Sequence, residues 1–558
     1  MRSMTDLLTA VSIIFIIAGP FLLVANRFKL PTVPLLILAG IIAGLFIDEG
    51  ATLELAQYGI ALLVFSFGLS IQFSAVRTVF ADSEVAAVGQ VFVIGTLGVG
   101  SGLVLGVPLA ESIYLGIAAA LSSTIVGTAL LDTEIRRNLV HGRLAKSIHF
   151  IQDLLAIVFL LVLGAGTLAA DPIAAQLGYG LALLAAAVLV NRYLFDMIGR
   201  FAGGSDELMI ISVISLLVVF VGAAESAGIS IVVGAFAAGL AVRHEPTEYL
   251  GLFNGLESIK DFFVAIFFLT VGALVAFPTL EKLLIVAVLV VLTGVVKPAV
   301  ATAILMYKGY EARSATLTSL STDQVSEFAL IIAIEALLLG LLSQLVFDAI
   351  IFAAAVTMIT SSVSQRYDER IHRGLASRGL LRGTYGKIDE WSAVPETISD
   401  HVIIAGYGRQ GRFLAETCER LGQPYVVIEN DPVRRRTVES ECAAFVFGDA
   451  MESYTWEKAN AEEAKLIVST VDSEPVSRRL LSLEFSADVI LRESDRTTAL
   501  DLFEAGALYV SVSELLAGQR LSQQLQDVLD GKLTPAELRD EQLTDLRPRT
   551  DAVSHRQR

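Results

Sequence analysis

The chain contains about thirteen apolar runs of roughly 17–25 residues, and this pattern restricts its possible folds more than any other feature. A helix of that length crosses the hydrocarbon core of a bilayer, where only helices and closed barrels satisfy their own backbone polar groups. A mean hydropathy of +0.66 also places the chain among membrane proteins. We therefore expect residues 1–365 to form a polytopic helical membrane domain. The runs start near Leu7, Val33, Ala56, Val85, Ile113, Ser147, Ile173, Leu208, Ile229, Asp261, Leu283, Thr316 and Gln344.

The charges between the runs predict the orientation of this domain, because Lys and Arg collect in cytoplasmic loops. Basic residues follow the odd-numbered runs, at Arg27, Lys29, Arg77, Arg136, Arg137, Arg143, Lys146, Arg192, Arg200, Arg243, Lys260, Lys308 and Arg313. The other loops are acidic, with Asp48, Glu49, Glu54, Glu111, Asp171 and Glu225, and Lys282 is the one basic exception. We therefore expect a multi-pass protein of the cell membrane, with its N-terminus outside and its C-terminal domain in the cytoplasm.

Residues 366–399 form a linker that is rich in basic side chains. These are Arg366, Arg370, Arg373, Arg378, Arg382 and Lys387. Such a segment can lie on anionic membrane lipids, and a solvated connector is an equally good interpretation. The whole chain has a formal net charge of −17, which argues against a nucleic-acid partner because nucleic acid requires a basic face.

Two of the runs are interrupted by polar residues, LGIAAALSSTIVGTALL in the fifth and ATLTSLSTDQVSEFALIIA in the twelfth. Broken helices at matching positions of two repeats are typical of transporter binding sites, since they free backbone groups to meet an ion. The fifth and twelfth runs are seven apart, which indicates two repeats of opposite orientation. The alternative for residues 122–124 is helix packing by small polar side chains.

Asp153 follows Gln152 inside the sixth run, AKSIHFIQDLLAIVFLLVLGAG. A carboxylate in the membrane is costly and usually lines a wet cavity that handles an ion or a proton. Lys297, in the eleventh run, is the expected counter-charge, with a purely structural ion pair as the alternative. Glu327 either adds a further site carboxylate or caps the broken helix. A single site acid indicates exchange of one proton per cation.

The segment HVIIAGYGRQGRFLAETCERLGQPYVVIEND predicts a strand, a glycine-rich turn, a helix and a second strand. Gly406, Gly408 and Gly411 form G-x-G-x-x-G, which lets backbone amides at a helix N-terminus approach a phosphate. Glu429 ends the second strand, where an acid pairs with ribose hydroxyls and favours NAD(H) or an adenine mononucleotide such as AMP over NADP. The basic residues 434–436 complicate that preference.

Four more strand-like segments follow, AAFVFGD, KLIVSTV, DVILRE and YVSVSE. Six strands with helices between them predict a doubly wound, Rossmann-like α/β domain over residues 400–517. The alternative to a working nucleotide site is an intact fold with a vestigial pocket. Residues 518–558 are expected to hold a C-terminal helix, either dimerising or the last of the core, and a polar, mobile tail beyond Thr534.

Together these residues resemble the cation:proton antiporter-2 family, especially its Kef-type potassium efflux members. The matching stretches are the Gln152–Asp153 pair, ALSST at 120–124, VGAFAAGL at 233–240, DFFVAIFFLTVGAL from Asp261 and QVSEF at 324–328. The soluble part resembles a TrkA-N domain, also called RCK. The resemblance extends from Leu7 to about Ala517, and it departs from the family at Ser326, where Gly is common.

The resemblance implies a homodimer in which a core with two crossed broken helices moves against a dimerisation domain. It implies that Asp153 binds cation and proton in turn beside Gln152, with Lys297 in the same core. Ser123 and Thr124 would lie where the helices cross. It also implies that a regulatory nucleotide controls transport. The expected nucleotide-site residues are Gly406, Gly408, Arg409, Gln410, Gly411, Glu429 and Asp449.

The sequence thus predicts a secondary monovalent cation:proton antiporter, with K⁺ or Na⁺ and H⁺ as partners and K⁺ favoured. A Na⁺/H⁺ antiporter is one alternative, and a ligand-gated K⁺ efflux channel is another. The channel is disfavoured because the sequence holds no TVGYG-like filter. We expect no enzyme, since no second substrate domain or catalytic constellation accompanies the glycine turn.

Overall fold

The computed structural model describes residues 2–28, 31–47, 49–71, 73–137, 139–163, 170–202, 205–243, 250–276, 279–381, 390–395 and 397–546. The chain divides into two compact units, Met1–Arg382 and Gly383–Arg558, and each is described by itself.

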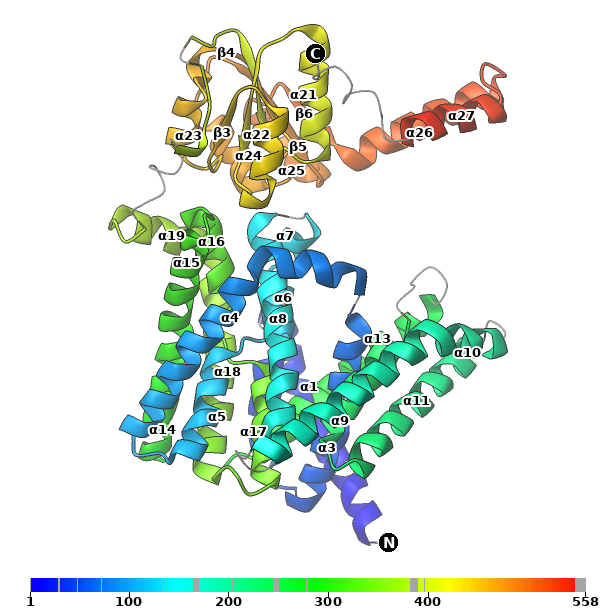
Figure 1. Ribbon diagram of the computed structural model, residues 1–558, viewed down its shortest axis with the longest axis vertical. Coiled ribbons are helices and arrows are strands. Elements are labelled where there is room, and N and C mark those ends of the chain that lie inside the picture. Colours follow the sequence, from blue (N-terminus) through cyan, green and yellow to red (C-terminus); the bar gives the residue numbers. More distant parts are fainter. Residues whose placement is uncertain are drawn as a thin grey trace. The chain divides into compact units, whose positions relative to one another are not determined.

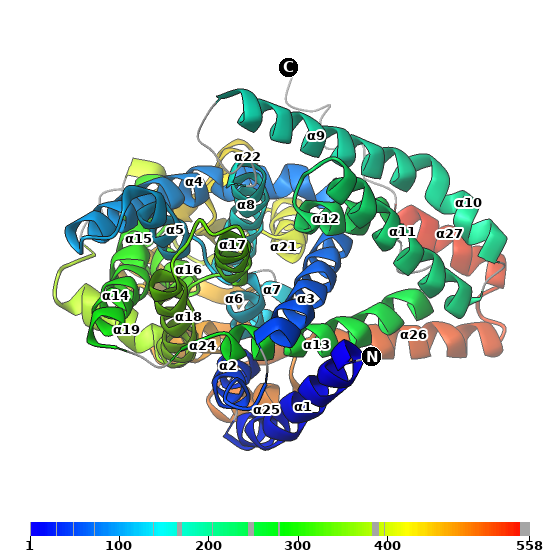
Figure 2. The same cartoon turned by 90° about the horizontal axis from the view of Figure 1, so that it is seen from below.

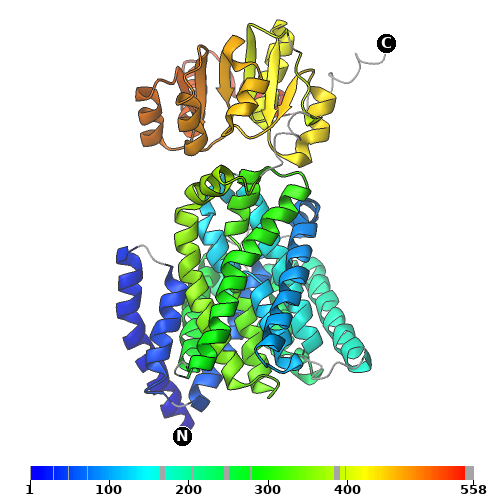
Figure 3. The same cartoon turned by 90° about the vertical axis from the view of Figure 1, so that its left-hand side faces the viewer.

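The first unit is a bundle of helices that run mostly side by side (Figure 3). Its helices are α1 Arg2–Phe28, α2 Thr32–Ala43, α3 Glu49–Ser70, α4 Phe73–Val104, α5 Leu109–Ala120, α6 Thr124–Leu130, α7 Asp132–Arg136, α8 Val140–Leu163, α9 Ala170–Leu189, α10 Phe195–Ala202, α11 Asp206–Ser226, α12 Ile231–Ala241, α13 Leu250–Ala273, α14 Leu280–Val291, α15 Lys297–Tyr307, α16 Ala312–Leu320, α17 Glu327–Leu338, α18 Gln344–Arg366 and α19 Asp368–Ser377. Two π-helical segments, η1 Val190–Leu194 and η2 Leu292–Val296, join α9 to α10 and α14 to α15.

The predicted apolar runs fall on these helices. Among the described residues, eight helical segments are long and apolar enough to cross a membrane, and four shorter apolar helices accompany them. The remaining predicted run is the pair α16 and α17, whose Ser- and Thr-rich sequence lowers its hydropathy. The helical membrane domain is thus confirmed, while the number of spans stays a prediction.

Most helices of this unit fall into two groups; Figure 2 shows α4, α5 and α15 on one side of the bundle and α11 and α12 on the other, while α2 packs beside α18. The first group contains α4, α5, α8 and α14 to α18, and the second contains α1, α2, α3, α11, α12 and α13. Within the second group α2 and α13 touch through glycine: a Cβ on Gly40 would lie 2.1 Å from Leu269 O, and one on Gly272 would lie 2.1 Å from Ile37 O. These two helices therefore pack backbone against backbone.

A buried ion pair ties the first group to the end of α13. Lys282 Nζ lies 2.5 Å from Asp348 Oδ2, and the Asp348 side chain is fully buried. Asp348 Oδ1 accepts from Gln344 Nε2 at 2.8 Å and from Ala276 N at 3.3 Å. The network joins α14, α18 and the residues that follow α13.

Two helices of the first group are broken where the sequence predicts. Between α5 and α6 the chain is extended at Leu121 and Ser123, and the Ser123 side chain caps α6 by accepting from Val126 N at 3.1 Å. Between α16 and α17 the chain turns through residues 321–326, and Ser326 caps α17 by accepting from Phe328 N at 3.0 Å. Local capping by serine explains why new helices start at these positions.

The second unit contains a six-stranded sheet with helices on both faces (Figure 1). Its strands are β1 His401–Ala405, β2 Tyr425–Glu429, β3 Phe445–Phe447, β4 Ala464–Ser469, β5 Asp488–Glu493 and β6 Tyr509–Val512. All neighbours pair in parallel, in the order β3-β2-β1-β4-β5-β6. This is the order of dinucleotide-binding folds, and all six predicted strands are present.

Helices connect the strands and extend the chain beyond them. They are α21 Arg409–Leu421, α22 Arg435–Glu441, α23 Ser453–Lys458, α24 Glu474–Leu481, α25 Arg496–Glu504, α26 Ser513–Leu529 and α27 Pro535–Leu546. Alternate residues of β1 enter two separate apolar cores, Ile403 on one face of the sheet and Ile404 on the other. The predicted polar tail beyond Thr534 is not wholly irregular, because α27 forms there.

Candidate ion and nucleotide sites

The two broken helices meet at their breaks, residues 121–124 and 321–327, which we call the crossing. Ser122 Oγ donates to Thr322 O at 3.0 Å, and Gln324 Nε2 donates to Ser123 O at 3.1 Å. Breaks of this kind leave helix-terminal N–H and C=O groups in the interior of the bundle. The crossing therefore collects positive helix N-termini and negative helix C-termini in one place.

Lys297 lies at the crossing with a fully buried side chain. Its Nζ donates to Leu121 O at 3.0 Å and to Gln324 O at 2.8 Å. Both acceptors are backbone carbonyls in the breaks, where C=O groups lack helical partners. The sequence predicts Lys297 as counter-charge to Asp153, but among the described residues the two form no ion pair. The π-helical segment η2 directly precedes Lys297, and such irregular turns recur at functional sites.

Asp153 and Gln152 reach the crossing from α8, and both are buried. Thr124 Oγ1 donates to Asp153 Oδ2 at 2.5 Å, and Ser122 N donates to Gln152 Oε1 at 2.9 Å. Within the described part of the chain, Asp153 Oδ1 and Gln152 Nε2 have no hydrogen-bond partner. The structure thus brings Asp153 and Gln152 to the residues that the sequence places at the helix crossing.

Glu327 is the first residue of α17 and contacts the other broken helix. Its Oε1 accepts from Ile125 N at 3.2 Å, so it caps the N-terminus of α6. The carboxylate thus stands at two positive helix ends, a placement that stabilises a negative charge. Its charge also acts on Asp153. The sequence left two roles open for Glu327. The hydrogen bond to Ile125 N supports the role of helix cap, and the proximity to Asp153 leaves the role of a further site carboxylate open.

Three further polar side chains at the crossing were missed as site residues by the sequence. Gln90 of α4 donates to Thr322 Oγ1 at 3.4 Å, and His149 Nε2 of α8 lies 3.2 Å from Ser321 O. Ser361 Oγ of α18 donates to Gln324 Oε1 at 3.1 Å. His149 precedes Asp153 by four residues, so helical spacing placed both on one face. Gln90 was a lone amide in an apolar run and gave no such signal.

The glycine turn of the second unit joins β1 to α21. Gly406 has a φ of +94°, and a Cβ there would lie 2.7 Å from Thr470 Oγ1. A Cβ on Gly411 would lie 2.0 Å from Gly406 O, so only glycine lets α21 pack this closely on the turn. Arg409 and Gln410 are the first residues of α21, where free N–H groups can meet a phosphate.

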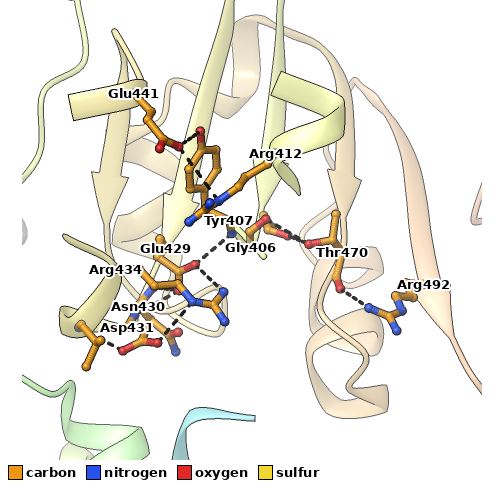
Figure 4. A network of polar contacts seen from close by, with 12 residues as sticks. Gly406, Tyr407, Arg412, Glu429, Asn430, Asp431, Arg434, Glu441, Thr470 and Arg492 are labelled. Atoms are coloured by element: carbon orange, nitrogen blue, oxygen red, sulfur yellow. Dashed lines mark hydrogen bonds and ion pairs between the residues drawn. The ribbon is translucent and has the colours of Figure 1, made fainter. Parts of the chain in front are cut away.

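Glu429 is buried at the end of β2, and its oxygens already have partners within the domain (Figure 4). Oε2 accepts from Tyr407 N at 2.9 Å, and Oε1 accepts from Asn430 N at 3.0 Å and Asp431 N at 3.1 Å. Burial raises the pKa of Glu429 above its ordinary value. The expected ribose acceptor therefore holds together the glycine turn and the loop after β2 in this structure.

Arg434 lies beside both Glu429 and the glycine turn (Figure 4). Its guanidinium contacts Glu429 Oε2 at 3.4 Å and Asp431 Oδ2 at 3.4 Å. Arg434 Nη1 is 3.5 Å from the position that a Cβ on Gly408 would take. Asp449, predicted for the same site, is buried after β3, where its Oδ1 accepts from Met451 N at 3.0 Å. Of the basic residues 434–436, Arg434 thus contacts the predicted nucleotide site.

Crossed broken helices around a buried carboxylate define a membrane carrier of ions, and the sheet order with its glycine turn defines an attached dinucleotide-type domain. Residues 11–365 match the family described as "Sodium/hydrogen exchanger, transmembrane", and residues 402–512 match the TrkA-N domain. Since the first match covers more than half of the chain, the chain belongs to the sodium/hydrogen exchanger family.

Relatives are similar over most of their length. YbaL of Escherichia coli K12, provisionally named a cation/proton antiporter, is 28% identical over 498 residues, covering 84% of this chain and 88% of YbaL. KefB of Alkalimonas amylolytica, provisionally named a K⁺ efflux antiporter, is 26% identical over 499 residues, covering 86% and 74%. The structure of the sodium proton antiporter MjNhaP1 from Methanocaldococcus jannaschii at pH 8 has a TM-score of 0.46 and 16% identity, covering 64% of this chain and 99% of MjNhaP1.

These findings confirm the family and the two-part architecture that the sequence predicts. The chain is a multi-pass membrane protein with a soluble C-terminal domain, and it is a cation/proton antiporter with an attached TrkA-N domain. The family consists of transporters and not of enzymes.

Proposed function

We propose that the protein exchanges K⁺ for H⁺ and that Asp153 binds the two ions in turn. The observation that carries this proposal is the state of its carboxylate. Asp153 is 1% exposed, one oxygen bonds Thr124 and the other has no hydrogen-bond partner among the described residues. An oxygen of this kind is available either to a proton or to a cation, and one group that both ions compete for produces exchange.

The neighbours of Asp153 suit a small cation. Thr124, the residue after Ser123, offers its hydroxyl oxygen beside Asp153, and Gln152 Oε1 accepts from Ser122 N so that the amide stays in place. Glu327 contributes negative charge to the same region. Lys297 binds the carbonyls of the two breaks, so it keeps the crossing assembled while the cation enters and leaves.

The preference for K⁺ is supported by the name of KefB, a relative over most of its length. A Na⁺/H⁺ exchanger uses the same oxygen chemistry and is the second candidate. A ligand-gated K⁺ channel fits less well, because a buried carboxylate between two broken helices suits a carrier. We further propose that the protein is a homodimer, that its N-terminus lies outside and that its basic linker contacts membrane lipids.

The second unit is proposed to bind a regulatory nucleotide, NAD(H) or AMP, at the glycine turn. Gly406, Gly408 and Gly411 would admit the phosphate, and the amides of Arg409 and Gln410 would bind it. Glu429 and Asp449 would then face the nucleoside. Because Arg434 pairs with Glu429 beside Gly408, a nucleotide has to displace Arg434 or bind against it. Ligand binding can bias transport when it favours one conformation of the whole chain.

The test is transport by the purified full chain in proteoliposomes, with K⁺, Na⁺ and Li⁺ compared across pH. Asp153→Asn is expected to abolish cation-driven proton movement, because the amide can neither release a proton nor offer a charge. Glu335→Gln is the matched control, since Glu335 lies in α17 and accepts from Ser230 Oγ away from the crossing. Exchange that persists in Asp153→Asn would refute the role of Asp153. The same vesicles with NADH or AMP added test regulation.

A further inference from the structure

Residues 391–393 of the linker, which we call the strap, lie against the edge of the sheet in the soluble unit. The edge strand is β3, and Ala393 forms an antiparallel bridge with Phe445 of that strand. Ala393 N donates to Phe445 O at 2.9 Å, and Phe445 N donates to Ala393 O at 2.8 Å. Beside this pair, Phe447 N donates to Ser392 Oγ at 2.9 Å. The strap is therefore held as an added edge segment, largely by main-chain groups.

Trp391 attaches the strap to α22 as well. The guanidinium carbon Cζ of Arg435 lies 4.2 Å from the centroid of the Trp391 ring, within the range of a cation–π contact. Arg435 Nε donates to Glu439 Oε1 at 2.6 Å, one turn further along α22, which orients the guanidinium. The Trp391 ring also meets the Phe447 ring edge to face, with centroids 6.2 Å apart. The strap thus contacts both β3 and the first residue of α22.

The start of α22 also borders the predicted nucleotide site. Arg434 is the last residue of the short 3₁₀ turn η3 Pro432–Arg434, and Arg435 is the first residue of α22. The Arg434 guanidinium pairs with Glu429, the expected ribose acceptor (Figure 4). The two arginines are consecutive, so a movement of the turn that takes Arg434 away from Glu429 also moves the guanidinium that stacks on Trp391.

The other end of the linker is attached to a broken helix of the membrane unit. Helix α19 packs against α16. Arg313 of α16 is buried, and its Nε donates to Glu369 Oε1 of α19 at 2.8 Å. Helix α16 ends at Leu320, directly before the turn that takes part in the crossing. The linker is therefore fixed to a helix of the crossing at one end and to the β3 edge of the sheet at the other.

We propose that the strap is a switch that reports occupancy of the nucleotide site to the linker. While Arg434 pairs with Glu429, the stack on Trp391 holds the strap on β3. An adenine nucleotide whose ribose takes the place of Arg434 on Glu429 moves the turn, weakens the stack and favours release of the strap. The linker then leaves the sheet edge while α19 stays on α16. This inference rests on the proposed nucleotide site and deepens it, because it names the first element that carries the signal out of the domain.

The first test uses the two tryptophans of the chain, Trp391 and Trp456. Trp456 is buried in the other apolar core of the domain, where its Nε1 donates to Ala450 O at 2.8 Å. Trp456→Phe leaves Trp391 as the only reporter, and Trp391→Phe leaves Trp456 as the matched control. The purified full chain in detergent is titrated with AMP and, separately, with NAD⁺.

On binding, we expect the emission of Trp391 to move to longer wavelength, because the released ring becomes exposed to water. The half-saturating concentration should equal that of binding measured by calorimetry, and the emission of Trp456 should stay unchanged. An unchanged or shorter-wavelength emission of Trp391, while calorimetry shows the nucleotide bound, would overturn the proposal. If neither nucleotide binds the full chain, the proposed nucleotide site itself fails, so the two failures are distinguishable.

Reciprocity provides a second measurement that does not depend on the folding of Trp456→Phe. If a nucleotide releases the strap, then weakening the strap must tighten nucleotide binding by the same coupling. Arg435→Gln removes the cation from the Trp391 ring. Arg436→Gln is the matched control, because Arg436 is exposed on the same helix and the variant loses the same charge.

The Kd of the bound nucleotide is expected to be about 2–5-fold lower in Arg435→Gln than in Arg436→Gln, the fold-change that corresponds to one cation–π contact. Any general effect of a lost positive charge on phosphate binding is common to both variants. Equal affinities, or weaker binding by Arg435→Gln, would contradict the proposal.

Discussion

Replacing Lys282 by Met is expected to destabilise the membrane unit strongly, because it leaves the Asp348 carboxylate buried without its cation. Breaking one side of a buried ion pair costs about 3–5 kcal/mol. Asp348 keeps the bonds from Gln344 Nε2 and Ala276 N. We therefore expect the lower end of that range, about 3 kcal/mol.

The double variant Lys282→Met/Asp348→Leu separates charge from packing. Replacing a buried pair by apolar side chains is often neutral or stabilising, so the double variant is expected to be more stable than Lys282→Met alone. Thermal unfolding in detergent measures all members of the cycle. Arg136→Ala is the surface control, because the Arg136–Asp132 pair is exposed to solvent and contributes little to stability. A single variant as stable as the control, or a double variant no better than the single, would refute the reasoning.

Three other predictions concern the remaining parts of the chain. Gly411→Ala places a Cβ against Gly406 O and is expected to lower the stability of the soluble domain by about 1–3 kcal/mol, measured by its thermal midpoint. Arg434→Ala frees Glu429 and the space beside Gly408, so it is expected to raise the affinity for AMP in calorimetry, and a weaker affinity would identify Arg434 as a ligand contact. Burial raises the pKa of Asp368 to about 6, so its contribution to stability is full below its ordinary value and falls as pH rises toward 6. Asp368→Asn is expected to remove this loss, about 1 kcal/mol after allowance for partial exposure, in unfolding midpoints compared at pH 4 and pH 7.

The sequence predicted those features that depend on neighbours along the chain. Apolar runs predicted the helices, and the succession of strand-like segments with helical segments between them predicted the six strands. Ser- and Thr-rich stretches predicted both breaks. The glycine spacing predicted the turn after β1, because a positive φ and close packing each leave little choice of residue. Asp153 was identifiable because a carboxylate inside an apolar run is costly and usually handles an ion or a proton.

The partners of these residues were not predictable, because they come from distant parts of the chain. Lys297 binds carbonyls at Leu121 and Gln324, and backbone acceptors leave no trace in side-chain identity. Glu429 likewise accepts from backbone amides, which the sequence does not reveal, and the sequence therefore assigned Glu429 to a ribose.

The contact between α2 and α13 has a consequence for how the bundle can rearrange. Where Gly40 and Gly272 bring two main chains together, no layer of side chains exists that can slide or change rotamer. We therefore expect α2 and α13 to tilt or shift together, as one rigid pair of helices. Relative movement is therefore expected between helices that are separated by side chains. A bulkier residue at Gly40 would force α2 and α13 apart without touching any ion ligand.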